Sequence, residues 1–318
     1  MTIAFFCGLL VPGLLLYLRK LTNNRIISKL DISRQTHTPI LGEIGHYDEH
    51  QSIAVKNNSR SPLAEQFRVL RTNLQFLLTD KSDKVILLTS TMSGEGKSFI
   101  AINLASTFAI SGKKVALLEM DLRKPKISSN LGIDNGIGFS TYAIGKAEID
   151  EIIKPSEILE NFYVIPSGPI PPNPAELIML NRTEELFEEL RNRFDYIIID
   201  TAPVGLVTDA QLLGKYADSS LYVVRQAYTF KHQIQIPHEI YSNSKLPKMS
   251  LIVNDVKMNL GFLYGYGYGY GYGYGYGYGY GYGYGYGNGY GYGVYGNGYF
   301  QEDKKPKGIK KVLQRIKK

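Results

Sequence analysis

Between residues 84 and 256 the chain alternates short, nearly continuous apolar runs with longer stretches of helical periodicity. The apolar runs are rich in Val, Ile and Leu, which is typical of strands covered on both faces. They comprise residues 84–90, 114–121, 162–168, 196–200, 220–226 and 250–255. Helical patterns lie between them, for example over residues 99–110 and 182–194. This alternation predicts an α/β fold with a doubly wound, mostly parallel sheet.

Two further helices are marked by their first residues. Ser61 and Pro62 predict a helix start with proline in the first helical position, and an apolar stripe follows at Leu63, Phe67, Leu70, Leu74 and Leu77. The sequence "NPAEL" predicts a second start, with Asn173 as the N-cap and Glu176 in the first turn. We therefore expect the folded domain to span residues 61–260, after a polar linker over residues 22–60.

The chain begins with an apolar run that has no charge before Arg19. Its length is near the lower limit for crossing a bilayer, and we predict a transmembrane helix over residues 1–21. A secretory signal would begin with positive charge, whereas here Lys20, Arg25 and Lys29 follow the run. The positive-inside rule then places the rest of the chain in the cytoplasm. A buried core helix is the alternative.

The net charge of +7 is concentrated at the C-terminal end. Residues 301–318 hold eight Lys or Arg against two acids, so the remainder is nearly neutral and a nucleic-acid partner is not indicated. Within this basic tail an apolar set recurs at helical spacing, namely Ile309, Val312, Leu313 and Ile316. An amphipathic helix on an anionic membrane and a solvated tail both fit this pattern.

The stretch "LLTSTMSGEGKSF", residues 87–99, leaves a predicted strand and enters a predicted helix. It resembles the P-loop template G-x-x-x-x-G-K-[ST], with Thr91 in place of the first glycine. Backbone N–H groups of such a loop face phosphates, a lysine reaches the β- and γ-oxygens, and a serine ligates Mg²⁺. We assign nucleotide binding to Ser93, Gly94, Glu95, Gly96, Lys97, Ser98 and Phe99. A plain glycine-rich turn is the alternative.

Two other predicted strands end in acids. "YIIIDTAPVG" ends its strand at Asp200, which is typical of a Walker B carboxylate beside the phosphates. "VALLEMDLRKP" brings Glu119, Asp121 and Arg123 to the end of a second strand. Phosphoryl transfer to a hydroxyl needs a carboxylate to orient it and accept its proton. We assign Mg²⁺ to Ser98, Asp200 and Asp121, and the base to Asp121; surface acids at strand ends are the alternative.

With "IPSGPIPPNPAEL" and "AEQFRVLRTNL", these motifs resemble the bacterial tyrosine kinase family. That family supplies the cytoplasmic kinase module of polysaccharide co-polymerases, which control capsule and exopolysaccharide assembly. The resemblance implies a P-loop NTPase fold with deviant Walker motifs, ATP and Mg²⁺ as cofactors, and tyrosine autophosphorylation. A lysine early in the P-loop, typical of the related partition ATPases, is replaced by Met92.

The resemblance also implies roles for particular residues. Lys97, Asp121, Glu119 and Arg123 are expected to be catalytic, although the family usually has Asp where Glu119 stands. Asn254 is expected near the adenine, with a strand-end turn as the alternative. A Glu-x-x-Arg-x-x-Arg set, Glu65, Arg68 and Arg71, implies ring assembly by neighbouring copies; a solvated helix face is the alternative. In the family two membrane helices at the bacterial plasma membrane flank an extracytoplasmic domain, and residues 1–21 resemble only the last of these helices. This implies a partner that carries the missing part, with a truncated reading frame as the alternative.

Residues 261–300 form a Gly-Tyr segment in which glycine frees the backbone beside nearly every tyrosine. We predict that these tyrosines accept phosphate in neighbouring subunits and are dephosphorylated by a cognate tyrosine phosphatase. An adhesive or aggregating material is one alternative reading. For the whole chain, the alternatives are a P-loop ATPase and an inactive assembly module. The predicted acceptors are Tyr264, Tyr266, Tyr268, Tyr270, Tyr272, Tyr274, Tyr276, Tyr278, Tyr280, Tyr282, Tyr284, Tyr286, Tyr290, Tyr292, Tyr295 and Tyr299.

Overall fold

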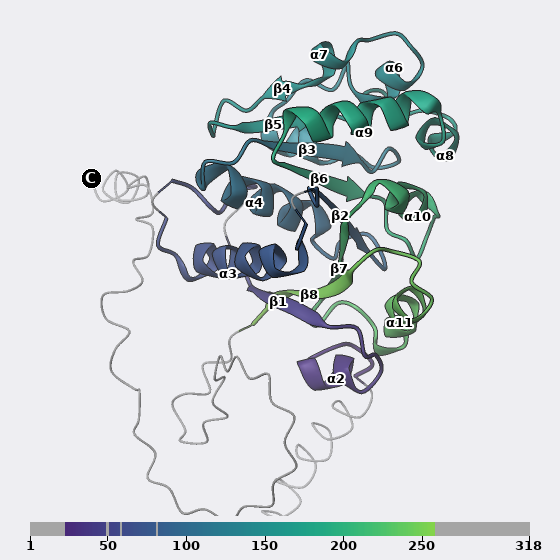
Figure 1. Ribbon diagram of the computed structural model, residues 1–318. Helices are drawn as coiled ribbons and strands as arrows, with labels where there is room; N and C mark the ends of the chain where they lie inside the picture. Colours follow the sequence, from purple (N-terminus) through teal and green to yellow (C-terminus); the bar gives the residue numbers. More distant parts are fainter. Residues whose placement is uncertain (1–22, 49–50, 58, 81, 258–318) are drawn as a thin grey trace, which may run out of the picture.

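The computed structural model describes residues 23–48, 51–57, 59–80 and 82–257. Its centre is one eight-stranded sheet in the order β1-β8-β7-β2-β6-β3-β5-β4 (Figure 1). Every pairing is parallel except that of β4 with β5. The strands are β1 (Ile40–Gly45), β2 (Val85–Ser90), β3 (Val115–Met120), β4 (Lys154–Pro155), β5 (Phe162–Ile165), β6 (Tyr196–Thr201), β7 (Ser219–Arg225) and β8 (Met249–Val256). The predicted fold class is confirmed.

Helices cover both faces of the sheet (Figure 1). On one face lie α3 (Pro62–Leu77) and α4 (Lys97–Ile110), and on the other lie α9 (Asn181–Arg193), α10 (Asp209–Leu213) and α11 (Gln235–Ser242). The remaining helices are α2 (Lys29–Ser33), α5 (Ile127–Leu131), α6 (Phe139–Ala143), α7 (Ile149–Ile152), α8 (Pro174–Ile178), and the 3₁₀ turns η1 (Gly214–Tyr216) and η2 (Lys231–Ile234).

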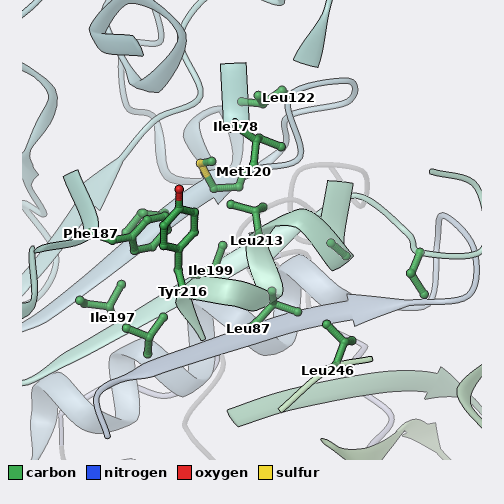
Figure 2. Close-up of a cluster of buried hydrophobic side chains, with 14 of the residues drawn as sticks. Leu87, Met120, Leu122, Ile178, Phe187, Ile197, Ile199, Leu213, Tyr216 and Leu246 are labelled. Carbon is green, nitrogen blue, oxygen red and sulfur yellow. The ribbon is translucent and has the colours of Figure 1, made fainter. Parts of the chain in front are cut away.

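Alternation along the buried strands divides the core into two layers. In β2, Val85 and Leu87 pack with α9 and α10, while Ile86 and Leu88 pack with α3 and α4. The first layer holds Phe187 and Tyr216, whose rings stack with centroids 4.4 Å apart (Figure 2). Since successive side chains of a strand point to opposite faces, both layers are apolar, and this explains the continuous apolar runs of the sequence.

Residues 22–60 differ from the predicted linker. They contain α2 and β1, and β1 pairs in parallel with β8 as the edge strand of the sheet. The short, weakly alternating run Ile40–Gly45 is stabilised by this pairing and by packing of Ile44 against the α3 layer. The helix start at Ser61 is confirmed: its side chain accepts a hydrogen bond from the Ala64 N–H at 3.2 Å.

The predicted transmembrane segment, the Gly-Tyr segment and the basic tail lie outside the described residues. Among the residues that are described, no helix combines the length and apolar character needed to cross a bilayer.

Candidate active site

The carboxyl ends of the parallel strands bring the predicted site residues to one edge of the sheet. Asp200 at the end of β6 stands in register with Leu88 of β2 and Glu119 of β3. Ligand sites of open α/β sheets lie at this edge, where strand order reverses. Here the reversal occurs around β2, between β7 and β6.

The loop between β2 and α4 has the backbone of a P-loop. Gly94 and Gly96 have φ values of +91° and +92°, a region that side chains with a Cβ rarely adopt. Gly96 is the N-cap of α4, so the first turn of a fourteen-residue helix opens toward the loop. A helix N-terminus favours anions through its free N–H groups and its dipole. The predicted phosphate-binding loop therefore has the required local structure.

Lys97 lies between the two predicted acids. Its Nζ is 3.1 Å from Asp200 Oδ1 and 3.8 Å from Asp121 Oδ2. Ser98 Oγ donates to Asp200 Oδ2 at 2.6 Å. Burial raises the pKa of the Asp200 carboxyl, while Lys97 and Ser98 act to lower it. The sequence-predicted quartet of Lys97, Ser98, Asp121 and Asp200 is thus assembled at one point.

The three oxygen-bearing members of this quartet, Ser98, Asp121 and Asp200, fit a bound Mg²⁺. This ion favours oxygen ligands and is usually held by one or two carboxylates together with substrate phosphates and water. Ser98 Oγ and Asp200 supply such a donor set from adjacent elements, and Asp121 is the nearest further carboxylate to Lys97. The metal would polarise the phosphate oxygens and neutralise charge that develops during transfer.

Glu119 does not face Lys97. Its side chain is fully buried, and its two oxygens accept three backbone N–H groups. Oε1 accepts from Ile127 and, at 3.3 Å, from Ser128, while Oε2 accepts from Ser167 at 3.3 Å. Glu119 therefore joins the start of α5 to the segment after β5. These contacts favour a structural role for Glu119, and the catalytic role stays a prediction.

Arg123, whose expected catalytic role stays a prediction, contacts a buried acid. Its guanidinium forms a two-pronged ion pair with Asp209, with Nε 2.9 Å from Oδ2 and Nη2 3.2 Å from Oδ1. Asp209 is almost fully buried at the start of α10. The pair joins the loop after β3 to the loop after β6. Sequence reasoning missed Asp209, because nothing in its local pattern distinguishes it from an ordinary helix-start acid.

The other residues predicted to bind the nucleotide differ in exposure and in their contacts. The Glu95 side chain turns inward and accepts from the Met92 N–H at 2.8 Å and from Thr229 Oγ1, and burial raises its pKa. Ser93 is exposed. Phe99 stacks on Tyr47 with ring centroids 5.6 Å apart. Asn254 Nδ2 donates to the Glu95 carbonyl at 2.9 Å, so its amide nitrogen contacts the loop.

A cleft of about 300 Å³ opens beside Gly96. Its walls come from the end of β1, the segment after it, α4, Asn130 and the ends of β7 and β8. The lining residues are Gly45, His46, Tyr47, Gln51, Ser52, Gly96, Phe99, Ile102, Asn130, Arg225, Asn254 and Asp255. Aromatic rings with a few convergent polar groups are typical of ligand pockets. The cleft adjoins the phosphate loop and suits the rest of a nucleotide.

The predicted assembly residues on α3 make contacts within the protomer. Glu65 pairs with Arg68, which also donates to the Ser59 carbonyl. Arg71 Nη1 donates to the Thr107 carbonyl of α4 at 3.0 Å, and burial lowers its pKa. Arg71 therefore joins α3 to α4, whereas Glu65 and Arg68 stay partly exposed.

A doubly wound sheet whose strand–loop–helix carries Lys97 beside two strand-end carboxylates defines a P-loop nucleotide-binding protein. Comparison with known proteins narrows this class. The family model described as "AAA domain" matches residues 83–246. The tyrosine-protein kinase YwqD of Bacillus subtilis is 36% identical over 215 residues, covering 68% of this chain and 90% of that protein. The tyrosine-protein kinase wzc of Salmonella typhimurium is 34% identical over 213 residues, covering 67% of this chain but 29% of that protein.

The chain is also similar in fold to solved structures. The chimerical protein CapA2B2 has a TM-score of 0.67 at 34% identity, over 73% of this chain and 100% of that chain. The kinase domain of the Escherichia coli tyrosine kinase ETK has a TM-score of 0.68 at 26% identity, over 76% of this chain and 100% of that chain. The chain belongs to the family of bacterial tyrosine-protein kinases.

Proposed function

We propose that this chain is a protein-tyrosine autokinase. It transfers the γ-phosphoryl group of ATP to the tyrosines of its own Gly-Tyr segment, in neighbouring copies. The observation that carries the proposal is the position of Lys97 within reach of Asp121 and Asp200, at the start of α4. An acceptor-activating acid next to a P-loop is what a kinase needs beyond nucleotide binding.

In this proposal each residue has one task. The loop N–H groups and Lys97 bind the β- and γ-phosphates, and Ser98 with Asp200 holds Mg²⁺. Asp121 orients the incoming phenol and takes its proton as the phenol oxygen bonds to the γ-phosphorus. The bond to the β,γ-bridging oxygen breaks and ADP leaves. Positioning and charge stabilisation supply most of the rate in such reactions.

The cellular setting is part of the same proposal. Residues 1–21 anchor the chain in the bacterial membrane, Glu65 with the arginines of α3 contacts a neighbouring copy in a ring, and a partner supplies a co-polymerase domain. The process served is capsule or exopolysaccharide synthesis. Support comes from the family membership and from the partial exposure of Glu65 and Arg68.

The decisive experiment is a phosphotyrosine blot of the full-length protein with MgATP. Wild type should become labelled, Lys97→Met should not, and the matched control Lys113→Met, an exposed lysine away from the loop, should behave like wild type. Labelling of Lys97→Met at the wild-type level would refute the proposal. ATP hydrolysis by wild type without phosphotyrosine would indicate the ATPase, and neither activity would indicate the assembly module.

Transfer between copies is tested by mixing two full-length variants. The donor carries Phe at all sixteen tyrosines between Tyr264 and Tyr299, and the acceptor is Lys97→Met. Phosphotyrosine should appear on the acceptor alone. If it appears only when one chain has both an intact Lys97 and the tyrosines, transfer is within a chain and the ring proposal fails.

A further inference from the structure

Three consecutive carbonyl groups of the P-loop each accept a hydrogen bond from a side chain at the ends of β7 and β8. Tyr228 Oη donates to the Ser93 carbonyl at 2.9 Å. Arg225 Nη1 donates to the Gly94 carbonyl at 2.8 Å. Asn254 Nδ2 donates to the Glu95 carbonyl at 2.9 Å. We call Tyr228, Arg225 and Asn254 the carbonyl clamp; all three lie outside the P-loop motif.

The orientation of these carbonyls determines where the neighbouring N–H groups point. A peptide unit is planar, and in the trans form its C=O and N–H point in opposite directions. The structure has no cis peptide bonds among the described residues. Each clamped carbonyl therefore turns the N–H of the next residue, at positions 94, 95 and 96, away from the clamp. N–H groups of this loop are the ones that bind phosphate.

The glycines of the loop are needed for the same contacts. A Cβ on Gly96 would stand 2.0 Å from Asn254 Nδ2, and one on Gly94 would stand 2.7 Å from Tyr228 Oη. Both distances are too short for non-bonded atoms. The glycines thus serve close approach by the clamp as well as their positive φ values.

The central member of the clamp is itself held in place. Arg225 Nε donates to Asp255 Oδ2 at 2.9 Å, and the guanidinium lies 5.2 Å from the centroid of the Tyr228 ring. Asp255 also receives a hydrogen bond from His46 at the end of β1. These contacts immobilise the arginine before any ligand arrives.

We propose that Tyr228, Arg225 and Asn254 are positioning residues that preset the N–H groups of the P-loop for the phosphates of a nucleoside di- or triphosphate. They act through the loop backbone, to which Asn254 contributes the hydrogen bond of its amide nitrogen. This inference rests on the proposed function, since it presumes that the loop binds a nucleotide.

The test is calorimetric titration of MgADP into the full-length protein, with magnesium pyrophosphate as a competing probe that lacks the nucleoside. Tyr228→Phe removes one hydroxyl, and Arg225→Lys removes the fork that reaches both Asp255 and the loop. Each should weaken MgADP and pyrophosphate binding about threefold to tenfold, the value of one hydrogen bond. In kinase assays KM for ATP should rise by a similar factor while kcat stays near wild type.

Matched controls are Tyr241→Phe, a partly exposed tyrosine on α11, and Arg193→Lys, whose ion pairs lie on α9 and α7. Both should bind MgADP like wild type. Clamp variants that bind like wild type would overturn the inference, and so would a loss of affinity that merely follows a lower melting temperature of the ligand-free protein.

Different results would refute the kinase proposal and the carbonyl-clamp proposal. If wild type binds MgADP and the clamp variants bind it more weakly, but no phosphotyrosine forms, then the kinase proposal falls and the clamp stands. If wild type phosphorylates its tyrosines and the variants bind normally, the clamp falls and the kinase stands. A wild-type protein that binds no MgADP would overturn both.

Discussion

Replacement of Glu119 by Gln separates a structural from a catalytic role for this acid. Its Oε1 accepts from Ile127 and Ser128, and its Oε2 accepts from Ser167. An amide keeps one acceptor oxygen for the first two N–H groups but turns an NH₂ group toward the Ser167 N–H. Two donors then face each other in a fully buried position.

The expected cost follows from that single mismatch. A buried donor left without an acceptor costs about 1–3 kcal/mol of unfolding free energy. For a domain of this size each kcal/mol lowers the melting temperature by about 2–4 °C, so Glu119→Gln should melt about 2–12 °C below wild type. The kcat for tyrosine phosphorylation, measured well below the melting transition, should stay within about threefold of wild type, because loss of a general base costs about 10²–10⁴-fold.

The assay combines thermal unfolding with initial rates of phosphotyrosine formation. Glu160→Gln, at an exposed position, is the matched control and should change neither quantity. Asp121→Asn should show the converse pattern, with kcat reduced about 10²–10⁴-fold and little change in melting temperature. A Glu119→Gln protein that melts like wild type but loses a hundredfold in kcat would refute the structural role.

Three further predictions follow from other contacts. The hydrogen bond that His46 donates to the Asp255 carboxylate raises the pKa of His46, so protonated His46 stabilises the fold below its ordinary pKa, and this contribution is lost as pH rises through the raised pKa. The melting temperature of wild type should therefore fall more between about pH 6 and about pH 9 than that of His46→Asn. Parallel curves would contradict this. Arg123→Ala leaves the buried Asp209 carboxylate without its partner and should lower the free energy of unfolding in urea by up to about 3–5 kcal/mol. Asp209→Asn should lower it less, because the half-exposed arginine can turn to water. Equal losses for the two variants would contradict this asymmetry. Asn103→Leu removes side-chain hydrogen bonds that hold residues 52–55 against α4. Calorimetry should then show weaker MgADP binding, because this segment adjoins the cleft. Unchanged affinity would mean that the segment does not shape the cleft.

The main strands and the P-loop quartet were predictable from sequence because their signals are local. Residues 115–118 of β3 and 196–199 of β6 form apolar runs, since both faces of these strands are covered. Parallel strands place their carboxyl ends at one edge, and this alone brings Asp121 and Asp200 toward Lys97. A Gly-Lys-Ser after a buried strand has few structural explanations other than a phosphate loop.

Other elements could not be predicted, because their partners are distant in the chain. Ile40–Gly45 has a weak pattern of its own and becomes a strand by pairing with β8, about two hundred residues later. Glu119 and Asp121 both carry a carboxylate and stand two residues apart, yet Glu119 accepts the N–H at the start of α5 while Asp121 lies beside Lys97. Nothing near Tyr228 in the sequence indicates its bond to Ser93.

The amino-acid sequence by itself determined the layered α/β architecture, the phosphate loop and the pair of strand-end acids, because hydrophobic periodicity and glycine placement act over a few residues. Only the tertiary structure decided which carboxylate accepts backbone N–H groups, which arginine is paired with Asp209 and which side chains contact the loop carbonyls. Those outcomes depend on hydrogen bonds between segments that the sheet brings together, and the geometry of such bonds has no signature in local sequence.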